Sequence, residues 1–583
     1  GTAGQLTCTQ ANSTMASLSF WLKNLSPWHH HGTRHASPPQ ELQADVVICG
    51  AGISGASLAY HLRNLRPELK VVVVEARGVS GGATGRNGGL MWPGLNAPWP
   101  ETIQKFGKDG AAKLMTYEMH AFQDIAAFVK GREDACAFSF FPEGGLTLFE
   151  SEEEARVMLA DTALQAEAGF PHVSIPVPAH ELPQRLHSST TAFVGGLRHP
   201  VVGRVTAARI VHELLREALD RPAGAADLAV LQHSAVTSIQ ALPEGGQAGV
   251  AAGGQQGGAV GEVWTAGAGM GAGGAAAMGV AAARAGAERC TLPPKLRVSV
   301  MPTSDSSDTP AGGLTIMCGA FVHATNGYNK LLPSLRDSGW LVPVRNQVAV
   351  TQPLPRDHPL PHASFSTRDG YVYFSRRADD RVVIGGFRDV VPHREVGTYD
   401  DTLVGLDPHV SACLRTYLPT AFPDLFTISA ASGKSGSSSH AADKAAKRVA
   451  GLSLHELQAV PTKGSDHHHH GHSHGHGHGR GHGAAPVELQ YELEWSGILG
   501  FTKDRWPLVG VLPAELSASG GAQNAEYACM GFTGHGMTRC FNCAKNLALM
   551  LAGEPTEQVF PATVFSPARV LVDSKVSLHP SKL

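Results

Sequence analysis

The chain has 583 residues, a formal net charge of -3 and 43% hydrophobic residues. This near-neutral balance gives no basic excess for nucleic acid and no acidic block typical of a charged tail. Nine cysteines are scattered along the chain, which excludes a compact disulfide-rich secreted scaffold. The uncharged run at residues 263–283 is mostly Gly and Ala, so we expect low complexity there rather than a membrane span.

The two ends of the chain suggest different destinations. Within residues 1–43, the first forty contain no Asp or Glu and several Ser and Thr. Such composition is typical of a plastid or mitochondrial transit peptide, and a disordered extension is the alternative. The tail at residues 571–583 ends in Ser581, Lys582 and Leu583, a tripeptide that the peroxisomal import receptor recognises. We therefore expect a peroxisomal protein that binds this receptor, with plastid, mitochondrion and cytoplasm as alternatives.

Two internal segments have compositions that cannot bury a core. Residues 241–313 form a Gly/Ala-rich insert, and residues 430–487 form a low-complexity insert with a His-rich stretch at 466–482. Closely spaced imidazoles bind transition metals weakly, but expansion of a surface loop is the interpretation that we favour. We therefore expect no functional metal site, and a metal-buffering protein is a distant alternative.

The remaining elements alternate in chain order between strands and helices. Residues 44–50 read as a buried strand, 54–67 as a helix and 70–75 as a second buried strand, which together predict a βαβ unit and a parallel sheet. Further along, the pattern predicts an amphipathic helix at 206–220 and a strand at 320–327. Residues 341–354, 370–376 and 381–387 alternate like strands of an antiparallel sheet. The predicted fold class is therefore α/β plus α+β.

A glycine motif lies at the first strand-to-helix turn. Gly50, Gly52 and Gly55 fit G-x-G-x-x-G, with Ile53 and Ser54 opening the helix, and Glu75 ends the second strand. In this context Gly50 permits the tight turn, Gly52 lets the backbone meet a pyrophosphate, and Gly55 allows close helix packing. A carboxylate at Glu75 suits ribose hydroxyls and disfavours a 2′-phosphate, so the motif predicts a Rossmann-like dinucleotide site that does not take NADP.

A second glycine-rich run, residues 80–89, follows Glu75 almost immediately and resembles the DAO superfamily of FAD-dependent oxidoreductases, which includes D-amino acid, glycine and sarcosine oxidases. Its motif ATGRNGG is most similar to the branch of gamma-glutamylputrescine oxidase-like proteins and uncharacterised fungal and algal relatives. In that family this segment runs along FAD toward the flavin ring. The resemblance implies these further cofactor-binding residues: Ala76, Arg77, Ala83, Thr84, Arg86, Asn87, Gly88 and Gly89.

The resemblance continues through the core. The strand at 233–239 resembles the one whose backbone meets adenine at Val236, and AFVHATNGY resembles a second FAD motif containing Ala324 and Thr325. The segment at 527–540 resembles the C-terminal return to the flavin, which implies contacts from Gly534, His535, Gly536 and Met537. Some sarcosine oxidase relatives attach FAD through a cysteine near the segment GFTKD, and none stands there. We therefore expect non-covalent FAD.

This resemblance implies two domains. The expected FAD-binding domain is Rossmann-like and discontinuous, and the expected substrate domain has a mixed or antiparallel sheet. We assign residues 44–100, 190–240, 314–340 and 488–570 to the first domain, and residues 101–189 and 341–429 to the second.

The expected reaction is oxidation of a C–N bond in a small-molecule amine or amino acid. Hydride passes to FAD, the imine hydrolyses, and oxygen reoxidises the flavin and releases hydrogen peroxide. Catalytic candidates are His535, Arg377, Tyr371 and Tyr373. Arg377 can clamp a carboxylate or form a surface ion pair with Asp379 or Asp380, and His535 can accept a proton or hold a structural hydrogen bond.

Two other functions are compatible with the same motifs. Sarcosine oxidase relatives use a lysine near the flavin for oxygen chemistry, and the matching strand here offers Arg376 and Arg377 instead. A flavin dehydrogenase with another acceptor is therefore one alternative. A trafficking or assembly protein that keeps FAD for stability is the other.

Overall fold

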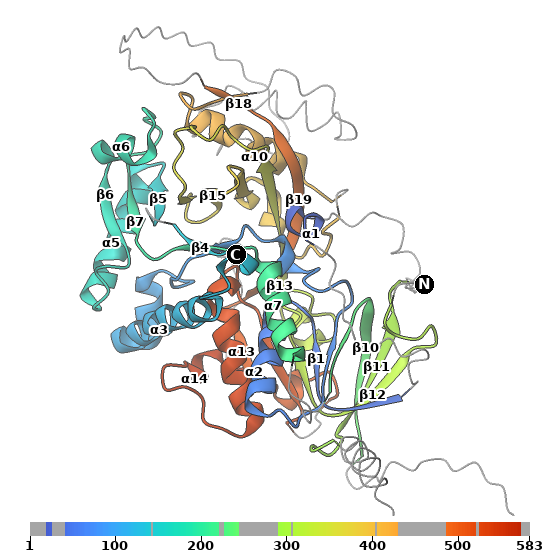
Figure 1. Cartoon of the computed structure of the whole chain (residues 1–583). Helices are drawn as coiled ribbons and strands as arrows, with labels where there is room; N and C mark the ends of the chain where they lie inside the picture. The colour runs from blue at the N-terminus through green and yellow to red at the C-terminus, as the bar shows by residue number, and fades with distance from the viewer. Residues whose placement is uncertain are drawn as a thin grey trace, which may run out of the picture.

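The computed structural model describes residues 19–25, 41–141, 144–220, 227–243, 290–304, 307–402, 405–428, 486–520 and 524–572. Two eight-stranded sheets dominate these residues, with helices packed against each (Figure 1). Ser581, Lys582 and Leu583 and the His-rich stretch at 466–482 lie outside the described residues. Within the described part, no helix combines the length and the apolar character needed to cross a membrane.

The first sheet contains the predicted βαβ unit. Its main strand order is β10-β11-β12-β1-β2-β9, with β21 beside the end of β12 and β20 beside β21. Strand β1 pairs in parallel with both β12 and β2, as the buried apolar runs predict. The bounds are β1 Glu41–Cys49, β2 Val71–Val74, β9 Leu228–Leu231, β10 Ser234–Ala241, β11 Leu296–Pro302, β12 Leu314–His323, β20 Leu508–Val511 and β21 Glu526–Met530.

Four helices cover one face of this sheet. They are α2 Ile53–Leu65, α3 Trp99–Val129, α7 Ala207–Leu219 and α13 Gly536–Ala552. Their buried apolar side chains form one cluster with those of β1 and β2. Strands β10, β11 and β12 supply a second cluster, which buries the alternate residues of β1 and β2. The parallel strands are therefore covered on both faces.

The second sheet has the order β19-β13-β16-β15-β14-β5-β7-β6. Helix α10, Pro408–Ala421, packs on one of its faces. On the opposite face, Gly88 lies against the ring of Tyr373, and Gly497 lies against Arg86. This face therefore borders the glycine-rich segment of the first domain. The bounds are β5 Gly145–Phe149, β6 Ile175–Pro178, β7 Gly195–His199, β13 Leu341–Thr351, β14 Ser364–Thr367, β15 Val372–Arg376, β16 Val382–Gly386 and β19 Tyr491–Thr502.

Short elements complete the described chain. The helices are α1 Phe20–Lys23, α4 Glu133–Cys136, α5 Glu152–Glu167, α6 Leu182–Leu186, α9 Pro333–Asp337, α14 Ala562–Phe565 and α15 Arg569–Val572. The strands are β3 Leu90–Met91, β4 Ser139–Phe140, β8 Gly203–Arg204, β17 Phe426–Ile428 and β18 Val487–Leu489. The 3-10 turns are η2 Ala83–Arg86, η3 Ala179–Glu181, η4 Arg388–Val390, η5 Pro392–Glu395 and η6 Ala514–Leu516.

The fold class agrees with the prediction, but the expected domain boundaries need correction. Helix α3 was assigned to the substrate domain, yet its apolar face packs into the helical layer of the first sheet. Strands β7 and β19 were assigned to the FAD-binding domain, yet they pair within the second sheet. These errors share a cause, because packing and strand pairing between distant segments leave no local signal in the sequence.

Two further boundaries were wrong at the edges of low-complexity segments. Strand β11 falls inside the expected insert at 241–313 but pairs with β10 and β12. Helix α1 falls inside the expected extension at 1–43, and Ser19, Phe20 and Trp21 are all buried. Both pieces are too short to change the average composition of the segment around them.

Candidate functional site

Packing of the first glycine turn requires two of its glycines. Gly50 has a φ of 113°, and a Cβ there would lie 2.7 Å from the carbonyl oxygen of Ala324. A Cβ on Gly55 would lie 1.9 Å from the carbonyl oxygen of Gly50. Both positions therefore need glycine for backbone and packing reasons, before any ligand is considered.

Gly52 differs from its two neighbours in this motif. It is the N-cap of α2 and, as a glycine, has no side chain that could cap the helix. A Cβ there would meet the Thr84 hydroxyl at 3.0 Å, which the backbone N–H of Ile53 also reaches at 3.0 Å. The start of α2 thus presents bare backbone with the positive end of a helix dipole behind it. That arrangement suits a pyrophosphate.

Glu75 lies directly beside the glycine turn. Its Oε2 accepts a hydrogen bond from the Ala51 N–H at 2.9 Å, and its Oε1 accepts one from the Arg77 N–H at 2.9 Å. A carboxylate retains further lone pairs, so these bonds orient Glu75 and leave it able to accept ribose hydroxyls. Strand β10 begins alongside, since the Ser234 N–H donates to the Glu75 carbonyl at 2.8 Å, and Val236 follows two residues later.

The second glycine-rich run connects the first turn to the start of α13. Arg86 is 3% exposed and donates to the carbonyls of Gly81 and Ser496, each at 3.0 Å. The Asn87 amide nitrogen lies 3.4 Å from the sulfur of Met537. Two predicted cofactor segments that are 450 residues apart in sequence therefore meet. Gly89 has a φ of 75°, and a Cβ there would lie 2.4 Å from the Val205 carbonyl oxygen.

Asp401 is a buried acid that was not predicted from the sequence and that contacts several residues of this region. Asp401 accepts hydrogen bonds from Arg77 at 2.6 Å and from the Tyr328 hydroxyl at 2.7 Å, and Arg86 lies 3.6 Å away. Burial alone would raise the pKa of Asp401, but these cations and the hydroxyl hold that pKa below its usual value. Asp401 lies in an irregular segment, where no local pattern could have indicated this role.

The start of α13 carries the predicted contacts near the flavin ring. Gly534 has a φ of 82°, and His535 is the half-buried N-cap of the helix. Burial and the neighbouring Arg539 lower the pKa of His535 to about 3. The imidazole is therefore neutral near physiological pH and is a weak base. Its role in proton transfer stays a prediction.

Tyr371 is the centre of a cationic cluster on the second sheet. Arg394 donates to its hydroxyl at 2.6 Å, and the Arg388 guanidinium carbon lies 4.4 Å from its ring centroid. Arg388 also lies 5.1 Å from the ring of Phe501, on β19. The sequence analysis found Tyr371 but missed both arginines, because they lie in the irregular segment after β16. A half-buried guanidinium beside a phenol suits a carboxylate.

The other two catalytic candidates lie in different surroundings. The Tyr373 hydroxyl accepts a hydrogen bond from the Asn346 amide at 3.2 Å, and burial raises its pKa. Arg377 donates to Asp379 at 3.1 Å and stacks on the Trp21 ring, with 4.3 Å between its guanidinium carbon and the ring centroid. The ion pair considered for Arg377 is thus present, and its guanidinium contacts neither Tyr371 nor Tyr373 in the described interactions.

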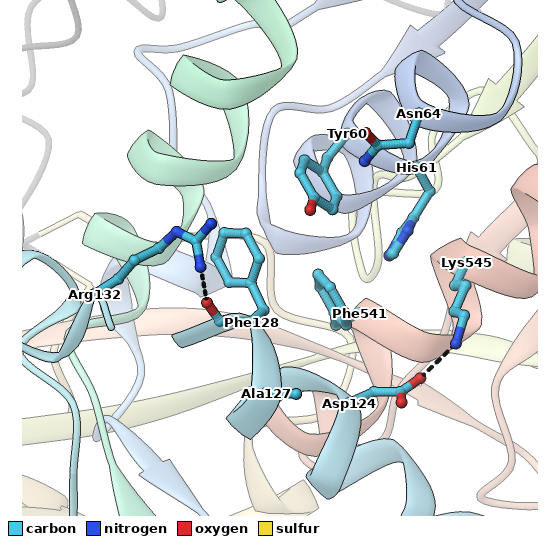
Figure 2. Close-up of a pocket in the computed structure, with 9 residues that line it drawn as sticks. All are labelled: Tyr60, His61, Asn64, Asp124, Ala127, Phe128, Arg132, Phe541 and Lys545. Atoms are coloured by element: carbon cyan, nitrogen blue, oxygen red, sulfur yellow. Dashed lines mark hydrogen bonds and ion pairs between the residues drawn. The ribbon is translucent and has the colours of Figure 1, made fainter. Parts of the chain in front are cut away.

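A surface hollow in the helical layer lies away from these residues. Figure 2 shows its lining: Tyr60, His61, Asn64, Asp124, Ala127, Phe128, Arg132, Phe541 and Lys545. Tyr60 is about 10 Å along α2 from the glycine turn, at 1.5 Å per residue. Lys545 is ion-paired with Asp124 at 3.1 Å and with Glu557. Because none of the predicted cofactor residues lines it, this hollow is not the candidate cofactor site.

The residues around the glycine turns fit a dinucleotide. They offer bare backbone at Gly52, a helix N-terminus for the phosphates, and an oriented carboxylate at Glu75 for a ribose. The described cysteines near α13 offer no competing chemistry, since burial raises the pKa of Cys540 to about 12 and leaves its thiol protonated.

Comparison with known proteins gives the same picture. The family described as FAD dependent oxidoreductase (DAO) matches residues 45–308 and 276–487. A probable oxidoreductase, OrdL of Rhizobium meliloti, is 29% identical over 181 residues, which span 31% of this chain and 40% of that relative. The glycine oxidase of Geobacillus kaustophilus has a similar structure, with a TM-score of 0.55, 14% identity and coverage of 91% of this chain and 99% of that one.

A second solved structure, the L-proline dehydrogenase of P. horikoshii, has a TM-score of 0.53 and 14% identity, and the match covers 91% of this chain and 99% of that one. At this identity the two structures support the fold alone. The family match covers most of the chain. The chain therefore belongs to the DAO family of FAD dependent oxidoreductases.

Proposed function

We propose that this protein oxidises the C–N bond of a carboxylate-bearing amine or amino acid, with oxygen as electron acceptor and hydrogen peroxide as product. The observation that supports this proposal is the pair of guanidinium groups around Tyr371. They lie on the sheet face that borders the segment at 80–89. In balanced form, a primary amine, oxygen and water give a carbonyl compound, ammonia and hydrogen peroxide, and an N-methyl amine releases a primary amine in place of ammonia.

The proposed cofactor is non-covalently bound FAD. In this arrangement the backbone at Gly52 and the first turn of α2 hold the pyrophosphate, and Glu75 accepts hydrogen bonds from a ribose. The start of α13 favours negative charge near the pyrimidine end of the ring. When bound, FAD supplies the two-electron acceptor for the substrate hydride.

The proposed substrate contacts come from the second sheet. Arg388 and Arg394 hold the carboxylate, and the Tyr371 hydroxyl, which Arg394 orients, directs the amine toward the ring. The amine binds in its neutral form, so its lone pair assists departure of the hydride. Similarity to the gamma-glutamylputrescine oxidase-like branch adds gamma-glutamylated polyamines to the candidates, since these also carry a carboxylate.

The proposal can be tested by anaerobic mixing with gamma-glutamylated polyamines, free polyamines, N-methyl amino acids and D-amino acids. We expect a carboxylate-bearing class to bleach the flavin absorbance, with rapid recovery and peroxide release on admission of air. Slow recovery of the flavin absorbance in air would indicate that the electron acceptor is not oxygen. A flavoprotein that no compound bleaches would contradict the proposal.

A variant separates carboxylate recognition from the chemical step. R388M removes a charge-assisted hydrogen-bond donor, so we expect KM to rise roughly ten- to a hundredfold. The matched control is R156M, because Arg156 is exposed on α5 and its ion pair with Glu153, at 2.6 Å, lies at the surface. An unchanged KM in R388M would show that Arg388 does not contact the substrate.

A further inference from the structure

Helix α1 brings the N-terminal segment against the predicted flavin-binding segment. Figure 1 shows α1 beside β19, and η2 lies next to both. Ser19 is fully buried, and Phe20 and Trp21 are 7% and 4% exposed. Such burial in a four-residue helix indicates a built contact, because a helix this short has little stability of its own.

Three successive carbonyl groups of the flavin-binding segment receive hydrogen bonds from this side. The Ser19 hydroxyl donates to the Gly85 carbonyl, and Trp21 Nε1 donates to the Asn87 carbonyl at 2.6 Å. Between them, Trp495 Nε1 of β19 donates to the Arg86 carbonyl at 2.8 Å. Two of the three donors therefore belong to the N-terminal segment.

Aromatic and cationic contacts hold α1 in this position. The rings of Trp21 and Trp495 meet edge to face at 6.1 Å, and Arg377 covers Trp21 at 4.3 Å. Arg381 similarly lies 5.2 Å from the ring of Phe20. Desolvated cation–π contacts are stabilising, so β15 and β16 clamp the helix against the segment.

We propose that Trp21 is a positioning residue for the flavin, acting through the backbone of residues 85–87. Its indole N–H, together with the Ser19 hydroxyl, fixes the direction of these carbonyls. Rotation of a peptide unit here would turn a carbonyl dipole toward the electron-rich cofactor. The proposal rests on FAD binding by the family and not on the identity of the substrate.

The proposal has a consequence for processing of the chain. If residues 1–43 were removed as a transit peptide, Ser19 and Trp21 would be lost from the cofactor site. We therefore infer that processing beyond Ser19 would weaken FAD binding.

The test measures the FAD dissociation constant of apoprotein by fluorescence quenching, together with the visible circular dichroism of bound flavin. W21F keeps an aromatic ring but lacks the N–H donor, and we expect its Kd to rise about three- to tenfold, as for one lost hydrogen bond. W21A should raise Kd further and change the flavin spectrum. K23A is the matched control, because Lys23 is exposed on the same helix.

Truncation provides the second arm. Removal of residues 1–18 should leave Kd and the flavin spectrum unchanged, whereas removal of residues 1–25 should raise Kd at least as much as W21A. Far-ultraviolet circular dichroism of each apoprotein identifies any variant that fails to fold, and W21F then decides the question. A wild-type Kd and flavin spectrum in folded W21F, or in the longer truncation, would overturn the proposal.

Discussion

The FAD side and the substrate side of this protein differ in how the chain builds them. On the proposed FAD side, the first glycine turn, Glu75 and the second glycine run fall within forty residues and form a spacing that the sequence displays, although Gly50 and Gly89 also pack against distant backbone. On the proposed substrate side, Tyr371 contacts Arg388 and Arg394, which lie in the short turns η4 and η5, and Arg388 also contacts Phe501 of β19. The proposed cofactor side is thus marked by a motif in the sequence, whereas the proposed substrate side carries no motif and was found only from the packing of the second sheet.

The largest effect should come from the glycines of the first turn. G55A places a Cβ 1.9 Å from the Gly50 carbonyl oxygen, so we expect loss of FAD binding and a loss of unfolding free energy of about 1–3 kcal/mol. G52A is the informative partner, because its Cβ meets a hydroxyl at 3.0 Å. It should fold normally and raise the FAD Kd about tenfold or more, a difference of about 1.4 kcal/mol.

These two variants separate the packing role of a glycine from its contact with the ligand within one motif. Thermal unfolding of the apoprotein and FAD titration measure the two properties independently. Equal loss of stability in G52A and G55A would show that Gly52 also serves packing, and would weaken the case for its contact with pyrophosphate.

The next effect concerns Glu75. E75Q keeps the size of the side chain but removes the charge that both backbone N–H groups and a ribose diol favour. We expect the FAD Kd to rise roughly tenfold, measured by fluorescence quenching. E68Q, at a side chain in an exposed ion pair, is the control and should bind FAD normally. An unchanged FAD Kd in E75Q would show that Glu75 does not contact the cofactor.

A smaller effect should appear on the substrate side. Y371F removes the hydroxyl that accepts a hydrogen bond from Arg394, so we expect KM to rise about three- to tenfold while the FAD Kd stays unchanged. Y399F is the control, because the Tyr399 hydroxyl donates to Asn329 elsewhere. Weakened FAD binding in Y371F would show that Tyr371 also serves the cofactor site, and would contradict separate cofactor and substrate regions.

The smallest effect concerns stability in acid. Burial lowers the pKa of His199 on β7 from 6.5 to about 4. Between these values the unfolded chain binds a proton that the folded protein does not, so stability falls as the pH drops through this range. H199Q removes this contribution, and its melting temperature should fall less than that of the wild type between about pH 7 and about pH 5. H180Q, at an exposed histidine, should behave like the wild type.

The limits of sequence reasoning follow from the same contrast. The βαβ unit, the antiparallel strands and the glycine roles at Gly50 and Gly55 were predictable, because each is marked by a local spacing of residues in the sequence. Arg388 and Arg394 were not, because only the packing of the second sheet brings them to Tyr371. Trp21 was also missed, since α1 is a short apolar stretch inside a segment whose average composition is polar.

Arg377 illustrates the opposite error. Its alternation with Tyr371 and Tyr373 along β15 suggested a shared role, but alternation fixes only the face of a strand. Along that face, Arg377 stacks on Trp21 and pairs with Asp379, whereas Tyr371 contacts the cluster of arginines. Position along a strand therefore matters as much as the face.

The most direct test of the central claim is a titration of the oxidised FAD-bound protein with benzoate, followed by the difference spectrum of the flavin. A carboxylate held by Arg388 and Arg394 next to the ring should perturb the flavin absorbance with saturation. Benzamide should have little effect on the spectrum, and R388M should raise the dissociation constant of benzoate roughly ten- to a hundredfold. Equal perturbation by benzamide, or an unaltered benzoate affinity in R388M, would contradict a carboxylate site on this face of the sheet.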